Sequence, residues 1–571
     1  MTPAVGAALF ASALAVVLVA LAVRLAARAR AERRARGAAR PATGWLARRI
    51  RARLGGYEHV VTAPEPHAPL VPPAPRRVAV VGGGLAGIGA AAALCERGVE
   101  VVVFEGSREL GGKIAPLRIP GPDGQPLELE HGFHAFFDHY YNLNRFLDRV
   151  GVRRHFARID DYLILAADGH RWSFRGLEPT PLLNLAALRR RGLFRLRDVL
   201  FTRARDELGV MLEYDRDATF AALDQTSFRD FAARAELPPA LRLVFATFAR
   251  AFFADEARLS MAELVKSFHF YFLSHDGGLL YGYPTGDYRR TVTDPIAHYL
   301  RERGARIELG APVDRIGHDG RRFTVRGEHF DDVVLATTSV GARAIALASD
   351  DLARRAPDLV AGLAALRPSQ RYAVYRLWVD RDARADVPVF VATERRAALD
   401  SVSFYHRITQ ESAAWVAARG RGAVLELHSY ALPDELEDGR VRRALLDDLF
   451  HYFPELAGMH VVHEHLEVRA DFTAFHVGMG AGRPGYRTPL EGLYLAGDWV
   501  DLPFPAMLME AAYSSGLVCA NAILERAGAR AHRVTSVPPR GILARRKSAA
   551  AKALGVPAGA PEVVVAGPAP G

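Results

Sequence analysis

The chain has 571 residues, half of them hydrophobic, so it is long enough for two domains and a large buried cavity. Its formal net charge is +10, but residues 24–53 hold eleven arginines against one acid, Glu32, and account for the whole excess. A basic excess confined to one short arm does not favour nucleic acid as a partner, and two cysteines exclude a disulfide framework or a zinc-type cysteine cluster.

The first predicted element is a transmembrane helix at residues 2–23. This stretch has no charged residue and is rich in Ala, Val and Leu. About 20 such residues cross a hydrocarbon core of about 30 Å. Arginines follow it directly, so the positive-inside rule predicts a single-pass anchor in the inner (cytoplasmic) membrane, with the catalytic domain in the cytoplasm and membrane lipid as a partner. The alternatives are a cleaved export signal or a misassigned start.

Residues 24–75 are predicted to form a basic arm and a proline-rich linker. Six prolines lie between residues 62 and 75, a composition that gives a stiff, extended spacer. At residue 77 the pattern changes abruptly to an apolar run that predicts a buried strand. We therefore expect the folded domain to begin near residue 76.

A nucleotide-binding motif occupies residues 78–113. An apolar strand leads into Gly82-x-Gly84-x-x-Gly87 and an Ala-rich helix, and Glu105 ends the next predicted strand. Gly82 permits the turn, Gly84 lets the backbone approach a pyrophosphate, and Gly87 lets helix and strand pack closely. Glu105 would accept hydrogen bonds from ribose hydroxyls and repel a 2′-phosphate, which disfavours NADP. NAD and FAD both remain possible at this point.

The residues after Glu105 favour FAD. Gly111-Gly112-Lys113 resembles the flavin amine oxidase and carotenoid (phytoene) desaturase superfamily, in which a basic residue after paired glycines adjoins the FAD pyrophosphate. Stretches 311–313, 331–337 and 493–499 resemble the same superfamily in the same order, and the last leads into a helix at 505–516. The resemblance implies FAD contacts at Gly82, Gly84, Leu85, Ala86, Gly87, Glu105, Gly111, Gly112, Lys113, Val313, Gly497, Asp498 and Met509.

The fold implied by the resemblance is α/β: a discontinuous Rossmann-like FAD-binding domain with an inserted α+β substrate domain, preceded by the transmembrane helix. We place the FAD-binding parts at residues 76–150, 286–340 and 470–526, and the substrate domain at 151–285 and 341–469. Residues 527–571 are rich in Ala, Gly, Pro and Arg and are predicted to form a disordered tail.

A motif in residues 129–142 narrows the resemblance. His131-Gly-Phe-His134-Ala-Phe-Phe followed by Tyr-Tyr-Asn-Leu is similar to the bacterial β-carotene desaturase/methylase (isorenieratene synthase-like) oxidoreductases. We predict that His134 and Glu130 transfer protons near the flavin, with buried structural histidines as the alternative. A metal site of His131, His134 and His139 is disfavoured, because no cysteine and only one aspartate lie nearby.

Other stretches bear on the substrate. Residues 243–253, 268–273 and 279–284 are rich in aromatic side chains, which indicate either packed core or a tunnel for a long polyene. Residues 189–203 mix arginines with Leu and Phe, a composition typical of a helix lying on anionic lipid or of a solvated basic helix.

The function predicted from this resemblance is that of an FAD-dependent oxidoreductase that desaturates a hydrophobic isoprenoid, with a carotenoid as the favoured substrate. Quinone or oxygen would reoxidise the flavin. One alternative is a flavin amine oxidase acting on a small amine, which would share the scaffold. An alternative of another class is a flavin-bound membrane carrier or assembly protein that catalyses no reaction.

Overall fold

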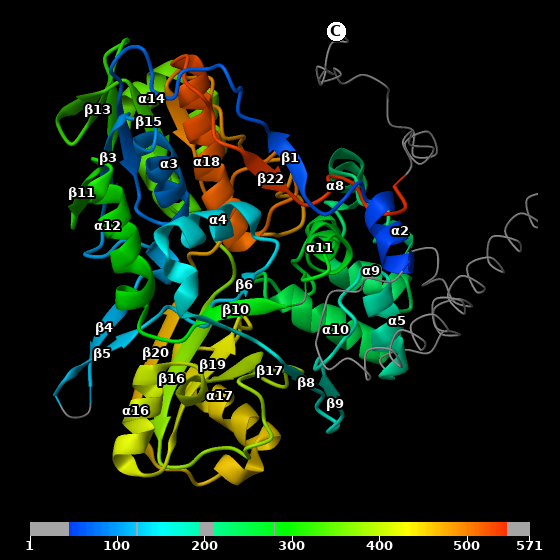
Figure 1. Ribbon diagram of the computed structural model, residues 1–571. Coiled ribbons are helices and arrows are strands. Elements are labelled where there is room, and N and C mark those ends of the chain that lie inside the picture. The colour runs from blue at the N-terminus through cyan, green and yellow to red at the C-terminus, as the bar shows by residue number, and fades with distance from the viewer. Residues whose placement is uncertain (1–44, 122–123, 193–208, 279, 545–571) are drawn as a thin grey trace, which may run out of the picture.

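The computed structural model describes residues 45–121, 124–192, 209–278 and 280–544 (Figure 1). The predicted transmembrane segment at 2–23 therefore lies outside the described residues, as do 193–203 of the basic stretch and 545–571 of the tail. No helix in the described ranges is long and apolar enough to cross a bilayer.

A five-stranded parallel sheet forms one half of the molecule. Its strand order is β11-β3-β2-β15-β21, and every neighbouring pair is parallel. Parallel strands are usually buried on both faces, which explains apolar runs such as residues 78–81. The sheet joins all three predicted FAD-binding segments. Its strands are β11 (Arg306–Leu309), β3 (Glu100–Glu105), β2 (Arg77–Val81), β15 (Asp332–Leu335) and β21 (Leu493–Leu495).

Helices cover both faces of this sheet (Figure 1). On one face α3 (Leu85–Cys95) packs against α18 (Leu508–Arg526), and the small residues of α3 are buried along its whole length. On the other face lie α13 (Ser339–Leu347), α14 (Asp350–Arg355) and α15 (Pro357–Ala364). Leu352 and Leu363 of these helices share a core with Val333 and Leu335 of β15. The predicted boundary at residue 340 is therefore too early, because residues up to about 366 pack on the parallel sheet.

A second, seven-stranded sheet forms the other half. Its order is β20-β16-β19-β18-β17-β8-β9, antiparallel except for the parallel pair β17–β8. Helix α17 (Asp438–Tyr452) buries Val441, Leu445 and Leu449 against one face. The strands are β20 (Val461–Arg469), β16 (Tyr372–Val379), β19 (Ala423–Ser429), β18 (Ser401–Phe404), β17 (Phe390–Thr393), β8 (Leu163–Leu165) and β9 (Arg171–Ser173).

Helices and short sheets complete the two halves. A helical group beside the seven-stranded sheet contains α5 (Leu183–Arg190), α8 (Arg216–Leu223), α9 (Phe228–Arg234), α10 (Pro239–Arg250) and α11 (Met261–Phe268). Further helices are α4 (Tyr141–Val150), α12 (Asp294–Glu302) and α16 (Gln410–Arg419). Short strands are β4 (Leu117–Pro120), β5 (Pro126–Leu129), β6 (Phe136–Phe137), β7 (Phe156–Arg158), β10 (Tyr281–Pro284), β12 (Ile316–His318), β13 (Phe323–Val325) and β14 (Glu328–Phe330).

Segments near the two chain ends pack together on the body. Strand β1 (His59–Thr62) pairs antiparallel with β22 (Val534–Ser536), and Val534 and Val537 are fully buried. The Arg530 side chain donates to the Ala68 carbonyl across 3.0 Å. The prediction of disorder is thus wrong for residues 527–544, and the proline-rich linker is docked rather than free. The pattern was missed because one short strand that pairs with a distant segment has no detectable periodicity.

The basic arm is also docked where the structure describes it. Helix α2 (Trp45–Arg53) buries Ile50, and Arg51 forms an ion pair with Asp276 at 2.8 Å. Tyr57 donates to the same carboxylate across 2.6 Å. The last turn of the arm is therefore held against the segment that follows α11.

Candidate active site

A single large cavity of about 950 Å³ lies between the two sheets, at the upper end of the usual size range for small-molecule sites. Its walls come from the turn before α3, the start of α18 and the face of the seven-stranded sheet opposite α17. The cavity brings together nearly all the predicted cofactor residues. The ones that line it are Gly82, Gly84, Leu85, Ala86, Glu105, Gly111, Gly112, Lys113, Val313, Gly497, Asp498 and Met509.

The glycine turn before α3 is shaped by close backbone contacts. Gly82 has a φ of +108°, and a Cβ there would lie 2.6 Å from the Ala336 carbonyl oxygen. Gly87 lies behind the turn and does not line the cavity. A Cβ on it would lie 1.9 Å from the Gly82 carbonyl oxygen, so only glycine allows the helix to pack this closely on the turn. The turn at Gly82 and the close packing at Gly87 agree with the predicted roles of these two glycines, and the approach of Gly84 to a pyrophosphate stays a prediction.

The N-terminus of α3 faces the same end of the cavity. Helix α3 begins at Leu85, and its N-cap, Gly84, supplies no side-chain cap. The first backbone N–H groups of a helix have no partner within the helix, and together with the helix dipole they form a site for phosphate. Leu85 and Ala86 line the cavity. This end of the cavity therefore fits a pyrophosphate.

Glu105 lies at the end of β3 beside the glycine turn. One of its carboxylate oxygens accepts from the Gly83 amide at 2.6 Å, and the other accepts from the Ser107 amide at 2.7 Å. Each carboxylate oxygen has a further lone pair, so the group can still accept hydrogen bonds from a ribose. The arrangement fits a nucleoside whose sugar has two free hydroxyls.

The remaining predicted cofactor residues continue the cavity toward the second sheet. Asp498 follows β21 and accepts from Thr473 Oγ1 at 2.7 Å, and Met509 lies in the first turn of α18. Lys113 donates to the Asp471 carbonyl at 2.9 Å, and its ammonium lies 4.2 Å from the centre of the Phe472 ring. These contacts lead from the glycine turn into the ring-lined part of the cavity.

Comparison with known proteins identifies this arrangement. Residues 85–524 match the family model of the flavin-containing amine oxidoreductases. The chain belongs to this family. It is an oxidoreductase, and FAD is its cofactor.

Curated relatives agree over most of the chain. A carotenoid phi-ring synthase of Streptomyces griseus is 37% identical over 490 residues, covering 84% of this chain and 94% of the relative. A carotenoid phi-ring synthase of Chlorobaculum tepidum is 28% identical, covering 82% and 92%. A 15-cis-phytoene desaturase of an Oncidium hybrid is 25% identical, covering 80% and 78%.

Solved structures share the fold at low sequence identity. An oxidoreductase from Methanosarcina mazei is 17% identical with a TM-score of 0.56, and it covers 77% of this chain and 99% of its own. Cyclohexylamine oxidase from Brevibacterium oxydans is 17% identical with a TM-score of 0.55, and it covers 79% and 100%. The predicted α/β flavin oxidoreductase fold is thereby confirmed, whereas its preceding transmembrane helix stays a prediction.

The substrate part of the cavity crosses the seven-stranded sheet strand by strand. Its floor is formed in order by Tyr372 on β16, His428 on β19, Ser401 on β18, Ala392 on β17 and Ile164 on β8. Neighbouring strands lie about 4.8 Å apart, so four steps span roughly 19 Å. The predicted tunnel for a long molecule is therefore geometrically available.

Aromatic side chains dominate this part of the cavity. Phe253 stacks on Phe472 with ring centres 3.7 Å apart, and its edge packs on Tyr372. Phe253 has a φ of +56°, a left-handed conformation that costs a non-glycine residue energy and that tends to occur at functional sites. Rings that line this part are Phe133, Phe137, Tyr162, Phe174, Phe248, Phe252, Phe253, Tyr271, Phe272, Tyr281, Tyr372, Phe390, Tyr430 and Phe472.

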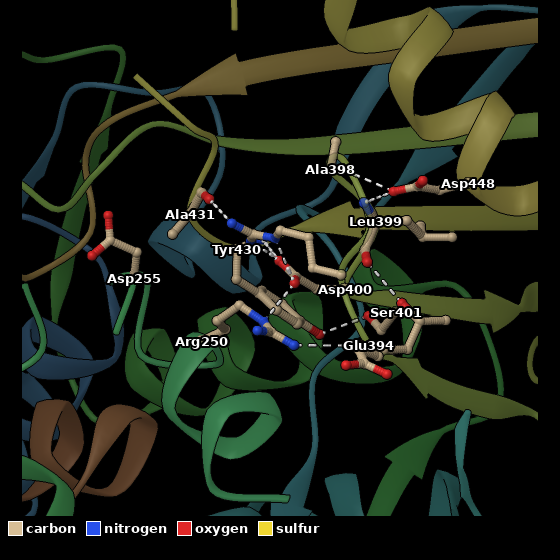
Figure 2. A network of polar contacts seen from close by, with 12 residues as sticks. Arg250, Asp255, Glu394, Ala398, Leu399, Asp400, Ser401, Tyr430, Ala431 and Asp448 are labelled. Atoms are coloured by element: carbon tan, nitrogen blue, oxygen red, sulfur yellow. Dashed lines mark hydrogen bonds and ion pairs between the residues drawn. The ribbon is translucent and has the colours of Figure 1, made fainter. Parts of the chain in front are cut away.

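One buried polar network interrupts the apolar floor (Figure 2). Asp400 forms ion pairs with Arg250, at 2.8 Å, and with Arg395, and it accepts from the Tyr430 amide at 2.8 Å. Burial lowers the pKa of Arg250. The Ser401 and Tyr430 hydroxyls hydrogen-bond each other at 2.9 Å. Because Asp400 is balanced by two arginines, this network offers no spare negative charge to the cavity.

The two predicted catalytic residues lie in different surroundings. His134 lines the cavity, its Nδ1 atom has no described partner, and burial lowers its pKa to about 4. Glu130 does not line the cavity: it forms a buried ion pair with Arg376 at 3.0 Å, although burial raises its pKa. A proton-transfer role stays a prediction for both, and of the two only His134 reaches the cavity.

Several lining residues were not predicted from the sequence. Tyr372, His428 and Tyr430 come from β16 and from β19 and its end, where no motif marks them, and only the pairing of distant strands brings them to the cavity. Lys113 and Phe472 meet for the same reason. Within the described ranges no three His, Cys, Asp or Glu side chains group as metal ligands.

Proposed function

We propose that this FAD-dependent oxidoreductase desaturates a carotenoid. The observation that carries the proposal is the ring-lined part of the cavity, whose floor leads away from the flavin-binding glycine turn across five strands, a length of roughly 19 Å. The similarity to phi-ring synthases and a phytoene desaturase over most of the chain supports the same substrate class.

The residues of the chain bind and orient such a substrate. Gly82, Leu85, Glu105 and Asp498 would hold FAD, and FAD would supply the two-electron acceptor. Phe390, Tyr281 and the other rings would bury the polyene and exclude water from its reacting end. A ring without polar atoms must be placed by shape alone, which suits a site made of packed aromatic side chains.

We further propose that the product ring is aromatic, as the names of the phi-ring synthases indicate for those relatives. A six-membered ring with one double bond becomes aromatic only through two further two-electron oxidations. A ring carbon that bears two methyl groups must also pass one methyl to its neighbour, because an aromatic carbon bears one substituent. The site would therefore act twice on one ring.

The charge distribution disfavours the amine oxidase alternative. In the described lining from the seven-stranded sheet and its loops, the carboxylate is Asp400, which two arginines already neutralise. Burying an unpaired ammonium would cost several kcal/mol. A neutral hydrocarbon does not incur this cost.

The test is anaerobic flavin reduction in purified protein. A carotenoid with a β-type end ring, supplied in detergent, is expected to bleach the flavin absorbance and yield a product two or four hydrogens lighter, whereas simple aliphatic amines leave the flavin oxidised. Reduction by amines alone would overturn the proposal. Flavin that no carotenoid or amine reduces would favour the non-catalytic carrier.

We also propose that quinone or oxygen reoxidises the flavin. The protein would be attached to the cytoplasmic face of the inner membrane. A substrate that dissolves in lipid would enter most readily from a bilayer, and the uncharged segment 2–23 followed by arginines supports an anchor. We predict that removing residues 1–44, which stops before α2, yields a flavin-bearing protein that a salt wash extracts. The full-length chain should need detergent, and salt-extractable full-length protein would contradict the anchor.

A further inference from the structure

A chain of hydrogen bonds leads out of the cavity beside Lys113. His131 Nε2 lies 2.8 Å from Tyr372 Oη, and Tyr372 donates its hydroxyl hydrogen to Asp471 Oδ1 at 2.7 Å. Both His131 and Tyr372 line the cavity, whereas Asp471 does not. The chain therefore has one end in the cavity and one end outside it.

The outer side of this chain lies at the edge of the molecule. Strand β20 is an edge strand of the seven-stranded sheet, and Asp471 lies just beyond its end at Arg469. Glu467 of β20 has a carboxylate oxygen 3.4 Å from His131 Nδ1, and its side chain is 15% exposed. Arg469, which pairs with Glu467 at 2.8 Å, is 40% exposed. A proton that reaches this edge can pass to water.

The direction of each hydrogen bond follows from the atoms involved. Tyr372 has one hydroxyl hydrogen, which it gives to Asp471, so its oxygen accepts from His131 Nε2. The Tyr372 oxygen has a second lone pair for a further hydrogen. Asp471, by contrast, can take up a proton and release it.

We propose that Tyr372 accepts the proton that the substrate loses and that Asp471 receives the hydroxyl hydrogen of Tyr372 in the same step. This inference rests on the proposed function. One substrate C–H bond gives its two electrons and its hydrogen as hydride to the flavin. The neighbouring C–H bond breaks, its electron pair becomes the new carbon–carbon double bond, and its proton goes to Tyr372 Oη. Tyr372 stays neutral throughout, Asp471 carries the proton to the edge of β20, and His131 positions the phenol.

A relay suits Tyr372 better than direct ionisation. Burial, and next the charge of Asp471, raise the pKa of the Tyr372 phenol well above its ordinary value, so a free phenolate is strongly disfavoured. Passing one proton on while accepting another avoids that charged state. His134, by contrast, has an Nδ1 atom without a described partner, so a proton taken up there has no outlet through that atom.

Burial, with charges that act in both directions, keeps His131 neutral. Burial lowers the pKa of His131; the positive charges of Arg469 and Lys113 lower it further, and Glu467 and Asp471 oppose them. His134 of the same loop is neutral for the same reason, burial. A neutral His131 has one ring hydrogen; when it is on Nε2 the ring donates to Tyr372, and Nδ1 then faces the Glu467 carboxylate at 3.4 Å without a hydrogen. In that tautomer, neutral His131 is the hydrogen-bond donor to Tyr372.

Tyr372→Phe tests the relay, with Tyr375→Phe as the matched control. Both tyrosines lie on β16 and both donate to a carboxylate, but Tyr375 bonds Glu464 and packs in the core under α17. We expect both variants to keep a full complement of FAD. Flavin reduction by the carotenoid should slow by about 10²-fold or more in Tyr372→Phe, the usual effect of losing a general base, and by less than about threefold in the control.

Asp471→Asn provides a second, independent variant, because asparagine still accepts a hydrogen bond from Tyr372 but cannot take its proton. We expect a similar loss of rate, and partial rescue by Asp471→Glu, which restores a carboxylate that can take the proton. The wild type should also react more slowly in D₂O, and Tyr372→Phe should not. Rates of Tyr372→Phe or Asp471→Asn equal to that of Tyr375→Phe would overturn the relay alone. A wild type that no carotenoid reduces would overturn the proposed function, and the relay with it.

Discussion

The two halves of the cavity are built from different parts of the chain. The half beside the five-stranded sheet presents backbone: a glycine turn, the N-terminus of α3 and one carboxylate, Glu105. The half beside the seven-stranded sheet presents side chains, most of them aromatic. The first half therefore has no room for an added Cβ at Gly82 or Gly87, whereas the second half determines which molecule is bound. Substitutions in each half should separate cofactor binding from turnover.

The largest expected effect is at Gly87. A Cβ there would lie 1.9 Å from a backbone oxygen that cannot move without opening the turn. We expect Gly87→Ala to yield no flavin-bearing protein, measured as the ratio of 450 nm to 280 nm absorbance. The control is Gly362→Ala in α15, where an added Cβ meets nothing within 4 Å and which should be neutral or slightly stabilising. Normal flavin content in Gly87→Ala would contradict the close packing of the turn.

Glu105 gives the next largest effect. Glu105→Lys removes a ribose acceptor and also the acceptor of two backbone amides, which are left without their carboxylate. Hydrogen bonds to charged groups contribute about 1.5–3 kcal/mol each, so FAD affinity should fall by at least about 10²-fold. Flavin release during dialysis measures the effect, and Glu302→Lys at the exposed end of α12, on the same half and away from the cavity, is the control. Full flavin retention in Glu105→Lys would show that the ribose lies elsewhere.

The sequence predicted the cofactor half in more detail than the substrate half, for a physical reason. A phosphate site needs particular backbone turns, and turns of this kind require glycine at fixed spacing. The glycine spacing in residues 82–87 is therefore enough to predict the turn that these residues form. Tyr372 and Tyr430 reach the cavity only because β16 and β19 pair across some fifty residues of sequence, and no local pattern encodes that pairing. The docking of β1 on β22 was missed for the same reason.

The motif at residues 129–142 shows the limit of such prediction within one loop. We predicted His134 and Glu130 near the flavin; His134 and its neighbour His131 line the cavity, yet Glu130 faces Arg376 behind the lining. Sequence alone could not separate these three neighbours, because the direction of each side chain depends on the second sheet. What distinguishes His131 from His134 is a partner, Tyr372, that lies 241 residues away.

His134 offers a smaller effect that sharpens the comparison. His134 faces the cavity but its Nδ1 atom has no described partner, so we expect His134→Ala to keep its FAD and to lose less than about tenfold in turnover, with an unchanged pH profile. The measurement is the rate of anaerobic flavin reduction, compared with Tyr372→Phe. A loss of 10²- to 10⁴-fold in His134→Ala with little change in Tyr372→Phe would assign the proton transfer to His134 instead.

Acid should destabilise the fold, because unfolding exposes buried neutral histidines such as His269 and His532 to protonation. His269, in the turn after α11, is fully buried, stacks on Tyr214 and bonds the Pro538 carbonyl at 2.7 Å. Burial lowers its pKa to about 4, below the value of about 6.5 expected in the unfolded chain. Between these values the unfolded chain binds the proton more tightly, so the contribution to stability is complete above pH 6.5 and is lost as pH falls toward 4.

The size of this loss follows from the two pKa values. At pH 5 the difference between pKa values of about 6.5 and about 4 corresponds to roughly 2 kcal/mol of unfolding free energy for His269 alone. His269→Gln, which keeps a donor for Pro538, should therefore lose less stability than the wild type between pH 7 and pH 5 in urea unfolding. His298→Gln, at a side chain that is 74% exposed, serves as the control. Equal pH dependence in the wild type and His269→Gln would show that other groups cause the acid sensitivity, and hydrogen exchange at pH 5 would then locate them in one half or the other.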